Sequence, residues 1–163
     1  RDGLDRLYAA QYSADIVAKL TEDWDPHPRI YDGLDCTLGA LAGGDDAGRT
    51  LTAFQRLLLD DAGLLPRFDA CVGCGHSPEG SPEIYFSSHE GGLLCRDCEP
   101  ARVEKRSVTV GYGALNGLAD ASAADVAGMF DLFDYHIAHL IGREPAAAES
   151  LRQMFRPRRR SNK

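Results

Sequence analysis

The sequence predicts a mainly α-helical fold, a helical bundle with a small β-hairpin insert. Two observations support this prediction. Along most of the chain apolar residues recur every three or four positions, which is the spacing of one buried helix face. Between residues 69 and 100 this period stops, and Gly, Ser, Pro and four cysteines take its place. We therefore expect a helical domain over residues 1–155, an insert at residues 69–100 and a basic, flexible tail at residues 156–163.

Length and composition are those of an ordinary globular domain. The chain has 163 residues, of which 44% are apolar and 26% are charged, enough for one hydrophobic core. No apolar run approaches the roughly 18 residues of a membrane helix, and no signal-peptide pattern is present, so we expect no membrane partner. The chain starts at Arg1 without an initiator Met. The chain therefore looks like a fragment, which leaves a preceding N-terminal domain and its targeting signal open.

The apolar period predicts three helices before the insert, at residues 4–20, 30–41 and 50–62. The segment Asp25-Pro-His-Pro separates the first two, because proline cannot donate a backbone hydrogen bond. Residues 43–48 are rich in Gly and Asp and are expected to form a flexible link. Gly63 is expected to end the third helix.

The insert is expected to contain a β-hairpin. Its strands are predicted at residues 84–87 and 93–95, around a turn that contains two glycines. Ser122 and Asp125 resemble a capping box, with Asp in place of the usual Glu. Helical pattern after the insert is expected at residues 108–118, 122–141 and 149–155.

The four cysteines predict a structural zinc site. Cys71 and Cys74 are separated by two residues, as are Cys95 and Cys98, with twenty residues between the pairs. This spacing lets two tight turns present four thiolates to one ion, and four soft thiolates favour Zn²⁺. Gly73 and Gly75 suit the first turn because glycine accepts positive φ angles and lets backbone N–H groups approach the sulfurs. We expect one Zn²⁺ per chain, without catalytic chemistry, because four protein ligands leave no position for water.

Other readings of the cysteines fit less well. A redox Cys-x-x-Cys motif usually occurs once, on a βαβ scaffold that this sequence lacks, and the spacing is not that of a ferredoxin cluster. His76 and His89 lie near the cysteines and could replace one of them as a ligand, but we expect them to be ordinary polar loop residues. Cys36 stands alone, and we expect it to be a small buried hydrophobic residue.

The sequence contains no positive indication of an active site. Gly111-Tyr-Gly113 begins a glycine-rich stretch, but the third glycine of a nucleotide-binding fingerprint would fall at Asn116. His136 and His139 have the i, i+3 spacing of some metal-binding bundles without the acidic partners, so we expect partly buried or interface histidines. We therefore predict that the chain is not an enzyme.

Charge is distributed unevenly. The net charge is −7, but from Arg152 onward there are six cations and no acid, which leaves 12 Lys and Arg against 25 Asp and Glu elsewhere, a balance of −13. The basic tail could contact phosphates, or it could be a solvated terminus. The candidate nucleic-acid residues are Arg156, Arg158, Arg159 and Arg160.

Four segments resemble the C-terminal part of the bacterial DNA repair protein RecO family. They are the acidic, proline-containing joint at 22–31, the helix at 54–66 that leads into the cysteines, the cysteine segment itself, and Tyr135-His-Ile-Ala-His-Leu. The resemblance spans residues 1–155. Gln55 departs from it, because members of the family commonly have an acidic residue there.

The resemblance implies a mediator of DNA repair and homologous recombination. Such proteins bind and anneal single-stranded DNA, contact the C-terminal tail of the single-stranded-DNA-binding protein, and act with RecR to load RecA, without nucleotide hydrolysis. It also implies a bacterial, cytoplasmic and nucleoid-associated protein. The family carries an N-terminal OB-fold, a platform for single strands. Without it, we expect this chain to bind single-stranded DNA weakly.

An acidic peptide with an apolar end would bind a hydrophobic groove that has a cation at its rim. The segment from 126 to 141, with a following arginine, could form one wall of such a groove, or its apolar face could simply be core. The candidate groove residues are Phe130, Phe133, Ile137 and Arg143.

Two other classes of function remain open from the sequence. One is a free-standing zinc-ribbon module of a transcription or RNA assembly, which an upstream OB-fold would disfavour. The other is a metal enzyme or redox protein that uses the cysteine pairs. Zinc content and thiol reactivity would separate this last class from a structural site.

Overall fold

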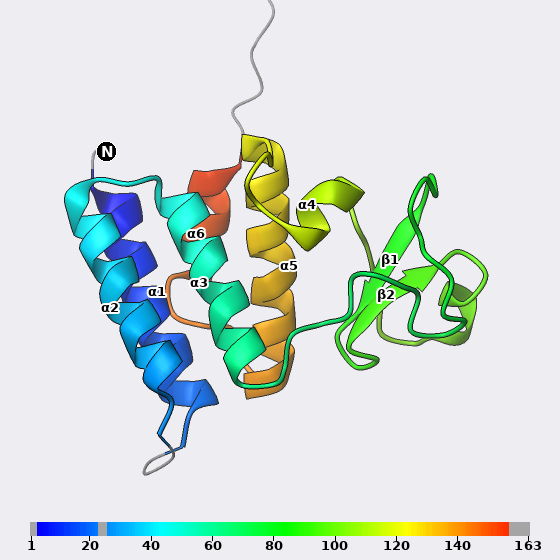
Figure 1. Cartoon of the computed structure of the whole chain (residues 1–163), viewed down its shortest axis with the longest axis horizontal. Coiled ribbons are helices and arrows are strands. Elements are labelled where there is room, and N and C mark those ends of the chain that lie inside the picture. Colours follow the sequence, from blue (N-terminus) through cyan, green and yellow to red (C-terminus); the bar gives the residue numbers. More distant parts are fainter. Residues whose placement is uncertain (1–2, 23–25, 157–163) are drawn as a thin grey trace, which may run out of the picture.

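The computed structural model describes residues 3–22 and 26–156. It consists of a helical bundle beside a small three-stranded lobe, with one short helix between them (Figure 1). This confirms the predicted mainly α fold with a β insert. Within the described ranges, no helix combines the length and hydrophobicity needed to cross a bilayer. The bundle helices are α1 (Leu4–Leu20), α2 (Pro28–Gly43), α3 (Ala47–Asp61), α5 (Ala123–Ile141) and α6 (Ala148–Phe155); the remaining elements are β1 (Ile84–Ser87), β2 (Gly92–Cys95), the 3₁₀ turn η1 (Glu99–Ala101), β3 (Arg106–Ser107) and α4 (Tyr112–Asn116).

Local capping explains where the helices start. The predicted capping box of α5 is confirmed, since Ser122 and Asp125 each bond the backbone N–H of the other. Helix α3 begins earlier than predicted because the Asp46 side chain accepts a hydrogen bond from the backbone N–H of Arg49. The expected flexible link at 43–48 is therefore wrong, since only residues 44–46 separate α2 from α3.

The segment after the insert is less helical than predicted. Of residues 108–118 only α4 is helical. The chain is extended before it because Ser107 and Arg106 pair with β1, and the N–H of Val108 donates to the carbonyl of Ile84. Strand pairing with a neighbour that is distant in sequence overrides the local helical pattern here.

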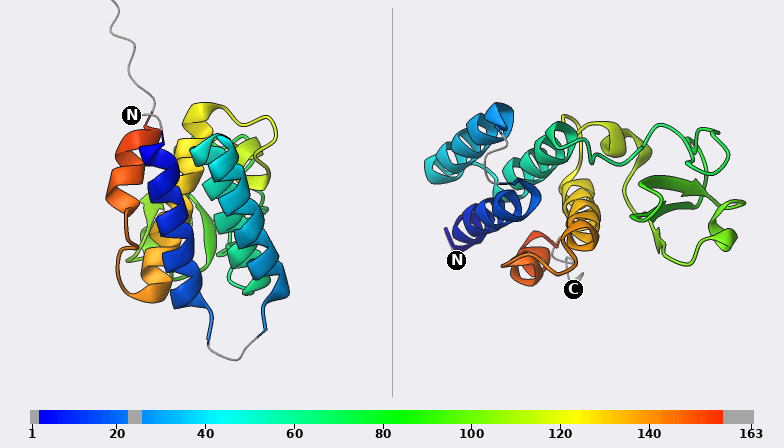
Figure 2. Two further views of the ribbon diagram at one scale, coloured as in Figure 1. Left: turned by 90° about the vertical axis from the view of Figure 1, so that its left-hand side faces the viewer. Right: turned by 90° about the horizontal axis from the view of Figure 1, so that it is seen from below.

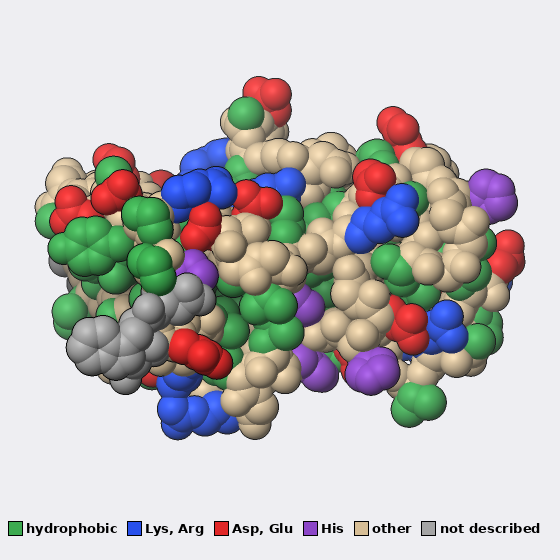
Figure 3. Space-filling model, turned by 60° about the horizontal axis from the view of Figure 1, so that its bottom comes forward, with side chains coloured by type: hydrophobic (Ala, Val, Ile, Leu, Met, Phe, Trp, Pro, Cys, Tyr) green, Lys and Arg blue, Asp and Glu red, His purple; other side chains and the backbone are tan. Residues whose placement is uncertain are grey.

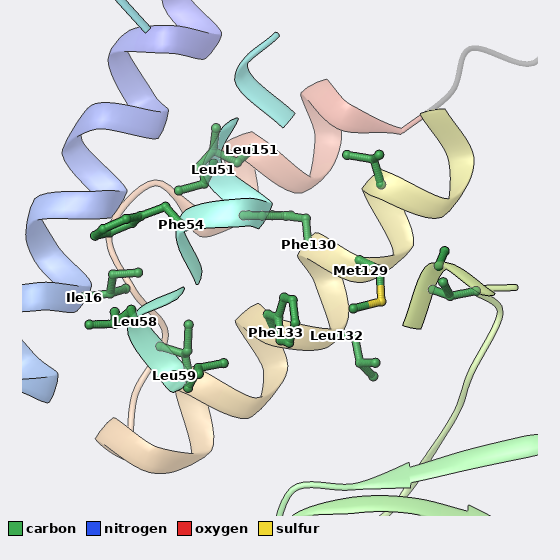
Figure 4. Packing of buried hydrophobic residues seen from close by; sticks show 14 of the residues in the cluster. Ile16, Leu51, Phe54, Leu58, Leu59, Met129, Phe130, Leu132, Phe133 and Leu151 are labelled. Carbon is green, nitrogen blue, oxygen red and sulfur yellow. The ribbon is translucent and has the colours of Figure 1, made fainter. Parts of the chain in front are cut away.

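Helices α3 and α5 lie against each other at the centre of the core (Figure 4). Phe130, Phe133 and Ile137 are fully buried. These three residues therefore belong to the core and do not line an open groove, so of the two alternatives that the sequence left open the core is the one that the structure supports. The reason is that α5 is covered by α1, α3 and α6 together. The labelled core side chains are Ile16, Leu51, Phe54, Leu58, Leu59, Met129, Phe130, Leu132, Phe133 and Leu151.

A buried polar network joins four helices of the bundle. The Tyr12 hydroxyl donates to Asp134 Oδ1 (2.9 Å), and Gln55 Nε2 donates to the Tyr12 hydroxyl (2.9 Å). Asp134 is fully buried and is paired with Arg152 of α6. Burial raises the pKa of Asp134 and, together with the charge of Asp134, that of Tyr12. An acidic residue in place of Gln55 would put a second carboxyl group into this network.

The insert is built on an antiparallel sheet with the order β2-β1-β3. The predicted hairpin is confirmed, with Ser87 opposite Gly92 and Ile84 opposite Cys95. Gly92 has no space for a side chain, because a Cβ atom would lie 2.7 Å from the carbonyl oxygen of Arg67. The sheet is thus fixed to the segment that carries the first cysteine pair.

Glu104 connects the hairpin turn to α5. Its carboxylate accepts hydrogen bonds from Ser87 Oγ (2.7 Å), His89 N (2.9 Å), Ser88 N (3.2 Å) and the hydroxyl of Tyr135. These four donors occupy the lone pairs that a carboxylate offers. We call Glu104 with these donors the Glu104 joint.

A buried histidine continues this joint. His136 Nε2 donates to the carbonyl of Leu64 (3.0 Å), so its Nδ1 accepts from Ser88 Oγ (2.7 Å). His136 is buried, and His139 is more exposed at the edge of the joint. Figure 3 shows histidine side chains gathered where the two lobes meet. Beneath them, Phe68 packs against both Phe86 and Phe133.

The Glu104 joint should make the free energy of unfolding decrease at acidic pH. Burial opposes the charge of Glu104, but the hydrogen bonds from Tyr135, His89 and Ser87 outweigh it and lower the pKa from 4.5 to about 2. The stabilisation is therefore complete above pH 4.5 and is lost as the pH falls from 4.5 towards 2. We expect Glu104→Gln to lower the free energy of unfolding at pH 7 by about 1–3 kcal/mol and to reduce the loss between pH 5 and 3.

Urea unfolding at several pH values would measure this effect. Glu83→Gln is the matched control, because Glu83 is half-exposed and pairs only with Arg96 at the surface; it should change stability by less than about 0.5 kcal/mol. An unchanged acid dependence in Glu104→Gln would contradict the assignment.

Candidate metal centre

Two turns of the insert bring the four predicted ligands together. Cys71 and Cys74 lie on the turn before β1, Cys95 ends β2, and Cys98 precedes η1. All four Sγ atoms lie within 4.8 Å of one another, and no other group of three or more potential metal ligands occurs in the part of the chain that is described. The cysteines could therefore hold one metal ion.

The spacing of the sulfurs fits a tetrahedral ion. Cys74 Sγ lies 3.7 Å from Cys95 Sγ. In a tetrahedron with metal–sulfur bonds of about 2.3 Å, neighbouring sulfurs are about 3.8 Å apart. The separation of these two sulfurs therefore matches that of two ligands of one zinc-sized ion, and four thiolates are the donor set that zinc prefers in structural sites.

Backbone groups stabilise negative charge at the first cysteine. Cys71 Sγ accepts hydrogen bonds from the N–H groups of Cys95 (3.3 Å) and Gly73 (3.4 Å). Burial opposes ionisation of Cys71, but these donors outweigh it and lower its pKa to about 6. The neighbouring Cys95 thiol, followed by burial, raises the pKa of Cys98 to about 12. Complete ionisation of the cluster thus requires a cation among the sulfurs.

The two glycines of the first turn have different roles. Gly75 has a φ angle of 79°, as expected for a turn glycine. Gly73 does not have a positive φ angle, so that part of the prediction is wrong for this residue, but its backbone N–H approaches Cys71 Sγ as expected (3.4 Å). Instead, a Cβ atom at Gly73 would lie 2.9 Å from Cys98 Sγ. Glycine is needed there because the two turns approach each other closely.

The nearby histidines and the fifth cysteine lie outside the cluster. His76 and His89 are exposed in loops, as expected. Cys36 is exposed on α2, so its predicted burial is wrong. Helix α2 lies at the edge of the bundle, where its main packing partners are α1 and α3 (Figure 2). One face of α2, including Cys36, therefore remains uncovered.

Two of the other candidate site residues, Arg143 and Arg156, lie within the described ranges. Arg156 is exposed at the end of α6, whereas Arg158, Arg159 and Arg160 lie outside the described residues. Arg143 is exposed after α5, but the apolar residues predicted to accompany it are buried.

The sequence reasoning missed a shallow apolar groove between α1 and α2. Its volume is about 290 Å³, and Arg6, Leu7 and Leu38 are among its lining residues. Leu7 is 62% exposed and Leu38 is 38% exposed. Arg6 forms no ion pair with any residue in the described ranges. The spacing of apolar residues in the first helix shows that Leu7 lies on its apolar face, but not that this part of the face is exposed.

Removal of one buried ligand should destabilise the protein. We expect Cys71→Ser to abolish stoichiometric zinc binding and to lower the free energy of unfolding by about 3 kcal/mol or more, because both turns depend on the ion. Metal analysis and urea unfolding of the purified protein measure both effects. Cys36→Ser is the control and should retain metal and stability. A fully stable Cys71→Ser protein would show that the cluster is dispensable.

Comparison with known proteins places the chain in a family. Residues 1–145 match the family model described as "Recombination protein O C terminal". The chain is 37% identical over 118 residues to the DNA repair protein RecO of Anaeromyxobacter dehalogenans (strain 2CP-C), covering 72% of this chain and 45% of that protein. It is 29% identical over 163 residues to RecO of Myxococcus xanthus, covering 94% of this chain and 65% of that protein.

The match to RecO of Roseiflexus sp. is similar, with 30% identity over 172 residues that cover 96% of this chain and 60% of that protein. The chain thus spans about half to two thirds of the length of these relatives. No solved structure matches the chain. The family match covers the bundle from α1 to α5 together with the four-cysteine insert, and the chain therefore belongs to the RecO C-terminal family.

Proposed function

We propose that this chain is the helical, zinc-stabilised part of a mediator of DNA repair and homologous recombination, and that it acts without catalysis. The observation that carries the proposal is the four-thiol cluster inside a chain that matches the RecO C-terminal family over residues 1–145. The relatives that share this region are named DNA repair protein RecO.

The ion has a structural role in this proposal. Cys71, Cys74, Cys95 and Cys98 would hold one Zn²⁺, which supplies a tetrahedral link between the two turns. Four thiolates exclude substrate from the metal, so the ion supports the shape of the insert. The insert in turn packs on α5 through Phe68 and the Glu104 joint. This packing disfavours the alternative of a free-standing zinc-ribbon module.

In the full-length protein, DNA binding and partner binding would belong to two different domains. An N-terminal OB-fold would supply most of the binding to single-stranded DNA, and the helical domain, with its insert at 69–100, would contact partner proteins. In this proposal the partners are RecR and the C-terminal tail of the single-stranded-DNA-binding protein, and their joint action supports strand annealing and the loading of RecA. The site of action is the bacterial nucleoid.

The groove between α1 and α2 is the best candidate for an acidic tail peptide. Leu7 and Leu38 offer an exposed apolar surface, and beside it lies the guanidinium of Arg6, which forms no ion pair within the described residues. An acidic peptide with an apolar end combines the complementary features. Arg6 also lies in the first turn of α1, where the helix dipole would add to the attraction of a negatively charged peptide.

We expect a synthetic tail peptide to bind this chain with a Kd of about 10–100 μM, which is typical of a small, exposed groove. Arg6→Glu and Leu7→Glu should each weaken binding at least about tenfold, since one reverses the rim charge and the other removes the apolar contact. Fluorescence anisotropy with a labelled peptide measures this. Arg143→Glu is the matched control and should bind normally; selective loss in that variant would place the peptide at the end of α5.

The basic tail is the proposed contact for single-stranded DNA. The remaining chain is strongly acidic, so binding should be weak and should depend on the tail arginines, including Arg156. Truncation after Phe155 is expected to abolish binding, because no phosphate contacts remain. If four arginines each contact one phosphate, the logarithm of affinity should fall with the logarithm of salt concentration with a slope of about −3.

Anisotropy of a labelled oligothymidylate at several salt concentrations measures this slope. Arg143→Gln removes one positive charge outside the tail and serves as a control for general charge effects. Binding that survives the truncation would show that the contact lies elsewhere on the domain.

A further inference from the structure

The four thiols of the cluster differ in accessibility. Cys71 is buried, Cys95 and Cys98 are partly exposed, and Cys74 is exposed. Cys71 Sγ also accepts two backbone hydrogen bonds, and a thiolate that is stabilised in this way is a weaker nucleophile. Cys74 is therefore the position at which a dissolved reagent meets the cluster first.

Cys74 also has a suitable reaction partner. Its Sγ lies 3.7 Å from Cys95 Sγ, which belongs to the other turn. A disulfide bond is about 2.05 Å long, so the two sulfurs would need to approach by less than about 2 Å. Cys74 is flanked by Gly73 and Gly75, and glycine allows the local backbone change that such an approach requires.

We propose that Cys74 is an oxidative modification site, at which peroxide opens the metal centre by forming a Cys74–Cys95 disulfide. The inference rests on the proposed zinc site. Bound zinc keeps the thiols deprotonated, and the thiolate is the nucleophile. In the first step the Cys74 thiolate attacks a peroxide oxygen, the O–O bond breaks, hydroxide leaves and a sulfenic acid remains.

In the second step the Cys95 thiolate attacks the sulfur of Cys74. The S–S bond forms, the S–O bond breaks and a second hydroxide leaves. Two thiolates thus supply the two electrons that reduce one peroxide molecule. Only Cys71 and Cys98 then remain as thiolates, whereas a structural zinc site requires four ligands, so Zn²⁺ is released.

The release should loosen the second turn more than the hairpin. Cys95 is paired with Ile84 in the sheet, and Val72 N donates to the carbonyl of Leu93. These backbone bonds do not depend on the metal. Cys98 and η1 have fewer such bonds within the sheet, so their attachment to the first turn depends on the ion. A reductant restores the four thiols and permits zinc to bind again.

The experiment uses the zinc-loaded Cys36→Ser protein, which removes the exposed thiol on α2. Hydrogen peroxide is added, released zinc is followed with a chromogenic chelator, and disulfides are mapped by mass spectrometry after alkylation. The expected result is one Cys74–Cys95 disulfide per zinc released, with recovery of zinc binding after reduction. A first disulfide that joins any other pair overturns the proposal.

A pair of variants tests the entry position. Cys74→His and Cys71→His each keep four potential zinc ligands. Cys74→His should slow zinc release at least about tenfold because it removes the exposed nucleophile, whereas Cys71→His should leave the rate nearly unchanged. Equal rates of zinc release in Cys74→His and its parent overturn the proposal. If a variant does not fold, disulfide mapping in the parent still decides whether the proposal holds. A parent protein that contains no zinc would instead overturn the structural role proposed for the cluster.

Discussion

Helix α5 is in contact with almost every other part of the protein, and its burial is the constraint on which the arrangement depends. Helices α1, α3 and α6 pack against it within the bundle, and the short helix α4 packs against it beside the bundle. On its remaining side Phe133 meets Phe68 of the insert, and Tyr135 meets Phe86. A single helix therefore belongs to both lobes. Any change that displaces the insert must also expose part of the bundle core, which favours one fixed orientation of the two lobes.

Polar groups determine how these apolar surfaces align. Asp134 and Glu104 are carboxylates in or beside the core, and both accept hydrogen bonds from other segments, Asp134 from Tyr12 and Arg152 and Glu104 from four donors. Such groups contribute modestly to net stability, because desolvation offsets their attraction. They penalise alternative packings strongly, however, since a shifted helix would leave a charge unpaired. We infer that the Glu104 joint fixes the position of the insert on α5. The aromatic contacts supply most of the free energy that holds the insert against the bundle.

The metal cluster and the joint lie in the same insert but restrain different segments. The cysteines connect the two turns, and the Glu104 joint connects the hairpin turn to α5. The sheet lies between them, with backbone pairing from Ile84 to Ser87. A structural ion at one end can thus stabilise the orientation of the whole insert on the bundle. This division also separates the reactive thiols from the surfaces of α1 and α2 that the proposed function uses for partners.

Features with a local cause were determined by the sequence alone. The spacing of the cysteine pairs, the capping box at Ser122 and the helical period depend on neighbours within a few residues, so the four-thiol cluster, the hairpin and most helices were predictable. Tertiary structure decided which faces are covered. An apolar stripe looks the same whether it is core or groove, and only the packing of other helices buried Phe130 and left Leu7 and Cys36 exposed. The Glu104 joint and the place of Gln55 beside Tyr12 likewise required contacts between distant segments, because hydrogen bonds across 31 or 43 residues leave no periodic signal in the chain.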